Sequence, residues 1–251
     1  MGRVIAISNQ KGGVGKTTTA INLSACLAEK GKRVLTIDMD PQGNTTSGLG
    51  IDKSTVEHTS YQLLTNETTI WEAMTPSIVP GLSVIASERS LAGAEIELIG
   101  VEDREFILKK EVDKVRDNYD FVIIDCPPSL NTLTVNAMTT ADTVLVPIQC
   151  EYYALEGLSE LIYTIELVKE RLNNKLEIEG VVFTMYDART CLSLQVVENV
   201  KQNLHQNIYK TIIPRNVRLA EAPSHGLPKS AGADGYRSLA DEVINRGKEE
   251  E

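Results

Sequence analysis

The chain has 251 residues, of which 42% are hydrophobic, so we expect one α/β domain with a large core over residues 1–251. Its formal net charge of −10 argues against a protein that coats nucleic acid with its whole surface, but is compatible with a local basic patch. The four cysteines form no Cys-x-x-Cys pair, which argues against a structural zinc site, and no apolar stretch approaches the length of a membrane span.

Short apolar runs rich in Val and Ile alternate with longer helical stretches. Runs that are continuous in this way are typical of a parallel sheet covered on both faces. The expected strands are Val4–Ser8, Arg33–Asp38, Leu82–Ala86, Phe121–Asp125, Thr143–Ile148, Gly180–Thr184 and Thr211–Pro214. The alternation of strands and helices predicts right-handed crossovers and a doubly wound α/β fold.

A glycine-rich segment with two lysines follows the first expected strand. Residues 10–18 read Gln-Lys-Gly-Gly-Val-Gly-Lys-Thr-Thr. The segment ends like the phosphate-binding loop G-x-x-x-x-G-K-[ST], in which backbone N–H groups surround phosphates while the lysine and hydroxyl reach phosphate and Mg²⁺. Gln10 stands where the first glycine is usual, and Lys11 is an additional lysine. The start of a helix at this loop favours phosphate binding over an incidental glycine-rich turn.

Two further segments end expected strands in carboxylates. Residues 37–44 read Ile-Asp-Met-Asp-Pro-Gln-Gly-Asn. Asp38 and Asp40 in this segment suit Mg²⁺ binding through water and activation of an attacking water, although the same residue types also favour a plain turn. Residues 121–128 read Phe-Val-Ile-Ile-Asp-Cys-Pro-Pro, which gives Asp125 the position of a Walker B carboxylate. Because ligands bind at the carboxyl ends of strands in such sheets, these segments should surround one crevice.

The three segments, in this order, resemble the deviant Walker A ATPases of the ParA/MinD family, and the Soj-like branch of chromosome-partitioning ParA proteins in particular. The resemblance covers residues 3–226 and includes the segments 92–98, 150–157 and 213–226. It implies a P-loop ATPase with a mostly parallel sheet that uses ATP and Mg²⁺.

The resemblance also implies roles for individual residues. Lys16 contacts the β- and γ-phosphates, Lys11 reaches across a dimer interface to the partner's nucleotide, and Asp40 orients or activates the hydrolytic water. The metal residues are Thr17 as a ligand and, through metal-bound water, Asp38 and Asp125. The other residues expected at the nucleotide are Gly12, Gly13, Val14, Gly15, Thr18, Met185, Pro214 and Asn216. The residues expected to bind DNA are Arg189, Lys201 and Arg218.

We therefore expect an ATP-dependent switch for chromosome or plasmid partitioning. ATP would close a homodimer that binds double-stranded DNA without sequence preference, and hydrolysis stimulated by a ParB-like partner would release it. The expected location is the cytoplasm, in association with the nucleoid and without membrane attachment. The residues by themselves support DNA binding only weakly, because isolated basic residues usually face solvent and the acidic neighbours Asp187 and Glu198 dilute their charge.

Other functions share this loop. A MinD-like ATPase that cycles on a membrane or a partner would end in a basic amphipathic helix, whereas this chain ends in three glutamates. An electron-transfer ATPase like the nitrogenase iron protein would need cluster cysteines besides Cys126. A small-molecule ligase or kinase would need a substrate pocket, which the sequence does not exclude. The chain departs from the family after Gly226, where a shortened segment with Leu227 in place of a frequent lysine leads to the last helix, expected at Asp234–Asn245.

Overall fold

The computed structural model describes residues 1–151, 154–203, 208–215 and 231–249. Within them, an eight-stranded sheet has the order β3-β4-β2-β5-β1-β6-β7-β8. Neighbouring strands are parallel, except that β3 and β4 pair antiparallel. The strands are β1 (Arg3–Ile7), β2 (Val34–Asp38), β3 (Met74–Pro76), β4 (Leu82–Ile85), β5 (Phe121–Asp125), β6 (Thr143–Gln149), β7 (Glu177–Tyr186) and β8 (Ile208–Pro214). This confirms the predicted doubly wound α/β fold.

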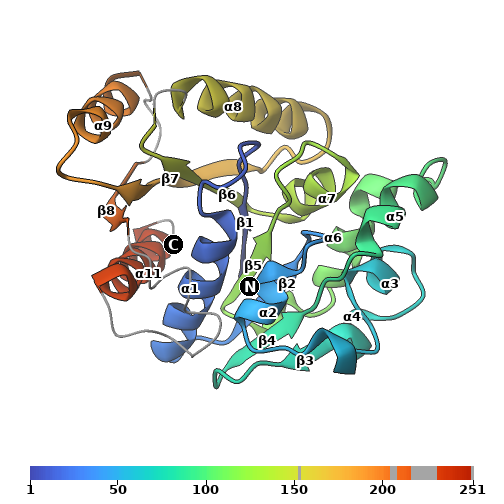
Figure 1. Cartoon of the computed structure of the whole chain (residues 1–251). Coiled ribbons are helices and arrows are strands. Elements are labelled where there is room, and N and C mark those ends of the chain that lie inside the picture. Colours follow the sequence, from blue (N-terminus) through green and yellow to red (C-terminus); the bar gives the residue numbers. More distant parts are fainter. Residues whose placement is uncertain (152–153, 204–207, 216–230, 250–251) are drawn as a thin grey trace.

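Helices cover both faces of the sheet (Figure 1). Their bounds are α1 (Lys16–Glu29), α2 (Asn44–Gly48), α3 (Ser60–Leu64), α4 (Ile70–Ala73), α5 (Leu91–Glu97), α6 (Ile107–Val112), α7 (Thr132–Thr140), α8 (Ala154–Arg171), α9 (Cys191–Asn203) and α11 (Ala231–Glu249). Buried residues of α1 and α11 share one hydrophobic cluster, while those of α3 to α9 belong to another on the opposite face.

The continuous apolar runs are explained by this double cover. Val4 and Ala6 of β1 belong to the cluster on the α7 and α8 side, whereas Ile5 and Ile7 belong to the cluster on the α1 side. All four are fully buried. Because successive side chains of a strand point to opposite faces, a strand covered on both sides needs apolar residues at every position.

All seven predicted strands are present, with changes in their bounds. β7 and β8 are longer than predicted, and α11 extends beyond the predicted last helix at both ends. β3 was missed, in the stretch between the second and third predicted strands. It has three residues, none of them buried, and it includes Pro76, so it shows neither the apolar run nor the full set of backbone donors of a central strand.

The sheet register brings the three motif segments to one edge. β5 lies between β1 and β2, and Asp125 is the register partner of both Ile7 and Asp38. The phosphate-binding loop therefore leaves the sheet next to Asp125, with Asp38 one strand further along the same edge. This edge is the carboxyl end of the parallel strands, where α/β sheets bind their ligands.

Candidate nucleotide site

The glycine-rich loop is fastened at its end by a strand far away in sequence. Gly15 caps α1 with φ 92°, in the left-handed region that favours glycine. Next to it, the carbonyl oxygen of Val14 accepts a hydrogen bond of 2.7 Å from the Thr184 hydroxyl of β7. Val14 itself is buried, so it supports the loop through the core and its backbone.

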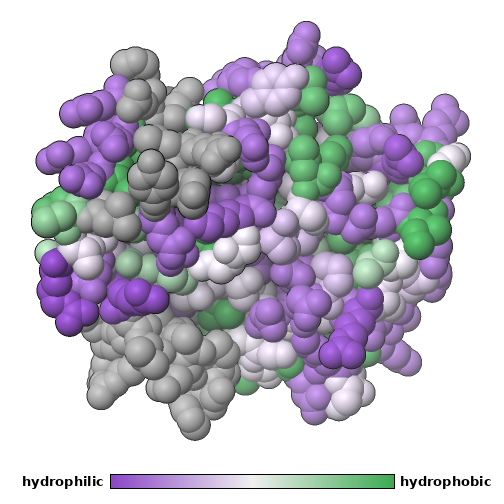
Figure 2. Space-filling view, turned by 45° about the horizontal axis from the view of Figure 1, so that its top comes forward, coloured by the Kyte–Doolittle hydropathy of each residue, from purple (hydrophilic) through white to green (hydrophobic). Residues whose placement is uncertain are grey.

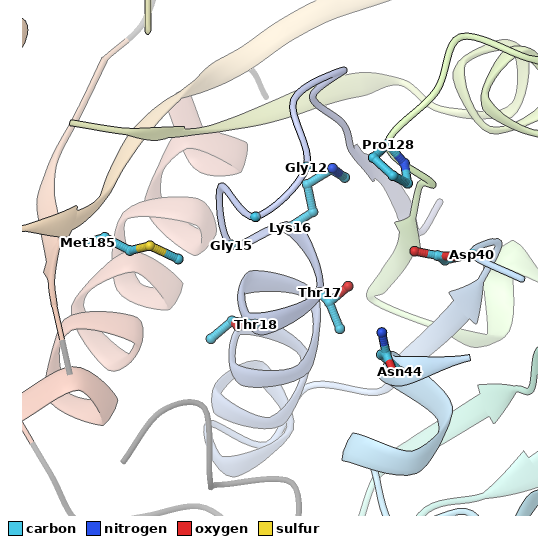
Figure 3. A pocket seen from close by; sticks show the side chains of 10 residues that line it. Gly12, Gly15, Lys16, Thr17, Thr18, Asp40, Asn44, Pro128 and Met185 are labelled. Carbon is cyan, nitrogen blue, oxygen red and sulfur yellow. The ribbon is translucent and has the colours of Figure 1, made fainter. Parts of the chain in front are cut away.

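A cavity of about 320 Å³ opens over this loop. Its lining comes from the loop, the first turn of α1 and three other segments, and consists of Gly12, Gly13, Gly15, Lys16, Thr17, Thr18, Asp40, Asn44, Pro128 and Met185. Figure 3 shows Thr17, Asp40 and Asn44 grouped on one side of the first turn of α1, with Met185 on the other side. The volume lies at the lower end of the range of small-molecule sites.

Asp125 is buried beneath the cavity with one oxygen engaged and one without a partner. Its Oδ2 accepts hydrogen bonds from the hydroxyls of Thr17, at 2.9 Å, and Thr45, at 2.7 Å. Its Oδ1 is buried and has no hydrogen-bond partner among the described residues. A buried carboxylate oxygen in this state lacks compensation for its lost hydration, so it suits a bound cation or a cation's water.

Asp38 is equally buried but fully engaged. Its carboxylate accepts hydrogen bonds from the Thr46 hydroxyl and the backbone N–H groups of Thr46 and Asp40. Burial raises the pKa of Asp38 to about 6, against these hydrogen bonds. Burial, and then the charge of Asp38, raise the pKa of Asp125 to about 7. Burial and mutual repulsion make the doubly ionised state of these two carboxylates unfavourable. A divalent cation bound here would stabilise that state.

The turn after Asp40 depends on one glycine. Gly43 has φ 62°, and a Cβ there would lie 2.5 Å from the carbonyl oxygen of Ser87. The backbone of this turn is therefore pressed against the strand end of β4, where the Ser87 hydroxyl donates a 2.7 Å hydrogen bond to the carbonyl oxygen of Asp40. Asp40 is 9% exposed at the cavity wall. The turn thus holds Asp40 at the mouth of the site and is more than a plain surface turn.

The two lysines of the loop point to different places. Lys16 is buried at the cavity, and its ammonium donates a 3.1 Å hydrogen bond to the carbonyl oxygen of Lys11. Burial lowers the pKa of Lys16, against the attraction of Asp125 and Asp40. The Lys11 side chain does not line the cavity; its ammonium forms a 2.8 Å ion pair with Glu151. Lys16 thus lies at the cavity, whereas Lys11 pairs with Glu151 outside the cavity lining.

Comparisons with known proteins identify the family. Residues 2–178 match a family model described as an AAA domain. The sporulation initiation inhibitor protein Soj of Bacillus subtilis is 55% identical, over 98% of this chain and 100% of that protein. The chromosome partitioning protein ParA of Caulobacter vibrioides is 52% identical, over 98% of this chain and 96% of that protein.

The chain belongs to the Soj/ParA family of chromosome-partitioning ATPases. Membership confirms the resemblance seen in the sequence, and the chain is an ATPase. A solved structure of cobyrinic acid a,c-diamide synthase from Mycobacterium smegmatis with bound ADP and magnesium is also similar, with a TM-score of 0.90 and 37% sequence identity over 100% of this chain and 97% of that one.

The structure of this Soj/ParA protein brings together most of the residues expected at the nucleotide. Ten residues line the cavity. Of the residues expected at the nucleotide, four are not part of this lining: Lys11, Val14, Pro214 and Asn216. Val14 and Lys11 contribute backbone groups instead, as described above, and Pro214 ends β8 next to Tyr186 without lining the cavity. Asn216 lies outside the described residues, as do Arg218 and the shortened segment after Gly226.

The two described residues expected at DNA do not line the cavity. Arg189 precedes α9, and its side chain is 88% exposed. Lys201 lies in the last turn of α9 and is exposed. The charge of Arg189 is not free, because its guanidinium pairs with Asp187.

Sequence reasoning missed several residues that complete the site. They are Thr45, Thr46, Thr184, Glu151 and, as lining without an assigned role, Asn44 and Pro128. Thr45 and Thr46 follow the Asp38 motif within one turn of helix, so their hydroxyls offered a local signal. Thr184 and Glu151 offered none, because their partners lie 170 and 140 residues away in the chain.

Proposed function

We propose that this ATPase is a dimerisation switch: ATP closes a homodimer in which each Lys11 reaches the partner's nucleotide, and the dimer binds DNA without sequence preference. ATP is its substrate and Mg²⁺ its metal. We further propose that a ParB-like partner stimulates hydrolysis and so releases the DNA. The proposal includes the cytoplasmic, nucleoid-associated location expected from the sequence.

One observation carries this proposal: Lys11 does not face the cavity of its own subunit. A single-subunit phosphate loop needs one lysine, and Lys16 already occupies that place. A second lysine outside that cavity would serve another subunit's phosphates by leaving its partly exposed ion pair with Glu151. Charge-assisted hydrogen bonds from an ammonium group to phosphate oxygens are strong, so such a lysine would make dimer affinity depend on the nucleotide's charge.

The described residues also fit the remaining roles. Thr17 and the unpartnered oxygen of Asp125 would hold Mg²⁺ and its water, and Asp38 would support them from below. The metal would supply positive charge to neutralise the phosphates. Lys16 would exchange its bond to the Lys11 carbonyl for a phosphate oxygen, and Asp40, at the cavity wall, would orient the attacking water.

A MinD-like cycle on a membrane would need an amphipathic helix with a free apolar face, and α11 does not supply one. In α11, buried residues pack against the α1 side of the sheet, and these are Tyr236, Leu239, Ala240 and Val243. The Tyr236 hydroxyl lies 3.0 Å from that of Thr19 in α1. The apolar face of this helix is therefore used by the core. No helix among the described residues combines the length and hydropathy needed to cross a bilayer.

Sedimentation velocity tests the switch. Asp40→Ala, which blocks hydrolysis in this proposal, should sediment as a dimer with Mg-ATP and as a monomer with ADP. Adding Lys11→Ala should abolish the dimer, whereas Lys175→Ala, which removes an exposed lysine outside the cavity lining, should not. A Lys11→Ala protein that dimerises normally would contradict the role in trans.

A DNA shift assay tests the second half of the proposal. The parent should retard unrelated duplexes equally with ATP and should not retard them with ADP or without nucleotide. Retention should fall steeply as salt rises, because such contacts are made to phosphates. If the ATP-bound dimer does not bind DNA, the DNA-binding half of the proposal is wrong, and the switch would act through another partner.

A further inference from the structure

An exposed arginine at the start of α9 is held by a carboxylate two residues before it. Arg189 donates to Asp187 from its Nε at 2.9 Å and from its Nη2 at 2.8 Å. The backbone N–H of Arg189 donates a third hydrogen bond, of 3.0 Å, to the same carboxylate. The arginine side chain is 88% exposed, while that of Asp187 is 20% exposed. The arginine thus folds back over the carboxylate although solvent surrounds it.

Asp187 is fixed in the turn that leads from β7 into α9. Its carbonyl oxygen accepts hydrogen bonds from the N–H, at 3.1 Å, and the hydroxyl, at 3.0 Å, of Thr190. Its own N–H donates to the Ser193 hydroxyl at 3.4 Å. These contacts hold the backbone of Asp187 in place and leave its carboxylate available to Arg189.

The contact occupies the edge of the guanidinium that recognises phosphate. Two parallel N–H groups of arginine bind a carboxylate or a phosphate in the same fork geometry, so the two acceptors are alternatives at one edge. The hydrogen bonds from Arg189 hold the pKa of Asp187 at about 2, and the charge of Arg189 and then of Arg215 adds to this effect. The carboxylate is therefore ionised at neutral pH.

The described part of this surface carries other charged side chains of both signs. Figure 2 shows the coloured residues at its left edge, where α9 and β8 lie in Figure 1, as mostly hydrophilic. Arg215 is exposed, and its N–H donates a 3.0 Å hydrogen bond to the carbonyl oxygen of Tyr186 beside Asp187. Lys201 lies at the other end of α9, about 15 Å from its start. Glu198, also exposed on α9, offsets one of these charges.

We propose that Asp187 competes with DNA phosphate for Arg189 and thereby limits the affinity of this protein for DNA. This inference rests on the DNA binding proposed above. A phosphate that binds Arg189 must displace a carboxylate of similar geometry, so the contact gains less than a free arginine would provide. The carboxylate also lies beside the incoming phosphate and repels it. An affinity held down in this way favours release of DNA once the dimer opens.

Asp187→Asn tests the inference with little structural change. The asparagine keeps the backbone contacts to Thr190 and Ser193, and its carbonyl oxygen still accepts from the N–H of Arg189. Glu198→Gln is the matched control, because it removes one negative charge from the same surface and leaves the Asp187–Arg189 pair intact. Thermal unfolding of each variant checks that the fold is retained.

DNA titrations in the ATP state should show tighter binding by Asp187→Asn, by roughly threefold or more for a dimer with two copies of the change. The slope of log affinity against log salt should become steeper by about 0.9 for each subunit, because one more arginine displaces a counterion. Glu198→Gln should produce a smaller change. Arg189→Gln should weaken binding more in the Asp187→Asn background than in the parent.

Equal DNA binding by Asp187→Asn would overturn the inference, since it would show that the Asp187–Arg189 pair does not limit affinity. Weaker binding would also overturn it, because it would show that Asp187 positions Arg189 for phosphate. Arg189→Gln with no effect in either background would also overturn it, while leaving DNA binding through other residues in place. Failure of both the parent and Asp187→Asn to bind DNA in any nucleotide state would overturn the inference together with the DNA-binding part of the proposed function.

Discussion

Replacing Glu151 by glutamine should strengthen the ATP-dependent dimer. In the single subunit, Glu151 holds the Lys11 ammonium at 2.8 Å, and Gln149 donates a hydrogen bond to its other oxygen. A lysine that serves the partner's nucleotide must first leave this carboxylate. Glu151→Gln removes the attraction while keeping the size of the side chain and its ability to accept from Gln149. The cost of releasing Lys11 therefore falls in the variant.

The exposure of the pair sets the expected magnitude. The side chains of Lys11 and Glu151 are 36% and 47% exposed, so the pair belongs to the partly solvated class that contributes about 0.2–1 kcal/mol. A dimer releases two such pairs, or about 0.4–2 kcal/mol in total. This corresponds to a dimer dissociation constant that is about 2- to 30-fold lower in the variant.

Sedimentation velocity over a range of protein concentrations, with Mg-ATP and in the Asp40→Ala background, measures this constant. Adding Lys11→Ala should abolish the dimer with either residue at position 151, because the gain from Glu151→Gln acts only through the lysine. A variant whose dimer is weaker than the parent's would refute the reasoning, since it would mean that Glu151 assists Lys11 in the closed dimer.

Three further outcomes follow from the site and its surroundings. Lys16→Ala should lose nucleotide binding by at least tenfold in an equilibrium titration, and unchanged steady-state phosphate release would refute the site. Of the four cysteines only Cys191 is exposed, so a thiol reagent should modify one cysteine rapidly in the native chain, and rapid modification of a second would contradict the buried positions of the others. In the metal-free protein, burial raises the pKa of Asp38 to about 6 and of Asp125 to about 7 from 3.8, so the folded state binds more protons than the unfolded state across this window. The contribution of these two groups to stability should therefore fall as pH rises from about 4 to about 7 and then level off, so the melting temperature in EDTA should depend less on pH for Asp125→Asn than for the parent.

Much of the nucleotide site was predictable because its key residues are consecutive in the chain. The segment 10–18 contains a whole phosphate-binding loop, and its glycines and lysines act through local backbone geometry. Asp38 and Asp125 each end an apolar run, and parallel strands bring such ends to one edge of the sheet. A single sequence therefore identifies these groups and the crevice between them.

Tertiary structure decided which residues support the phosphate-binding loop and its lysines. Thr184 supports the loop and Glu151 holds Lys11 from positions more than 100 residues away, and no periodicity or spacing links such pairs. β3 was not predicted because it is an edge strand of three residues. Pairing with β4 is enough to form it, and it does not need a run of buried apolar residues.

The pairing of charged side chains also depends on structure, although the sequence gives their positions in the chain. The sequence determines that Arg189 has a carboxylate two residues away, but whether the two meet depends on backbone dihedral angles in the turn before α9. Residue types and their local order thus determined the family, the fold class and the phosphate loop. Which charges are buried, paired or left facing a cavity depends on contacts between distant segments, and these form only when the sheet assembles.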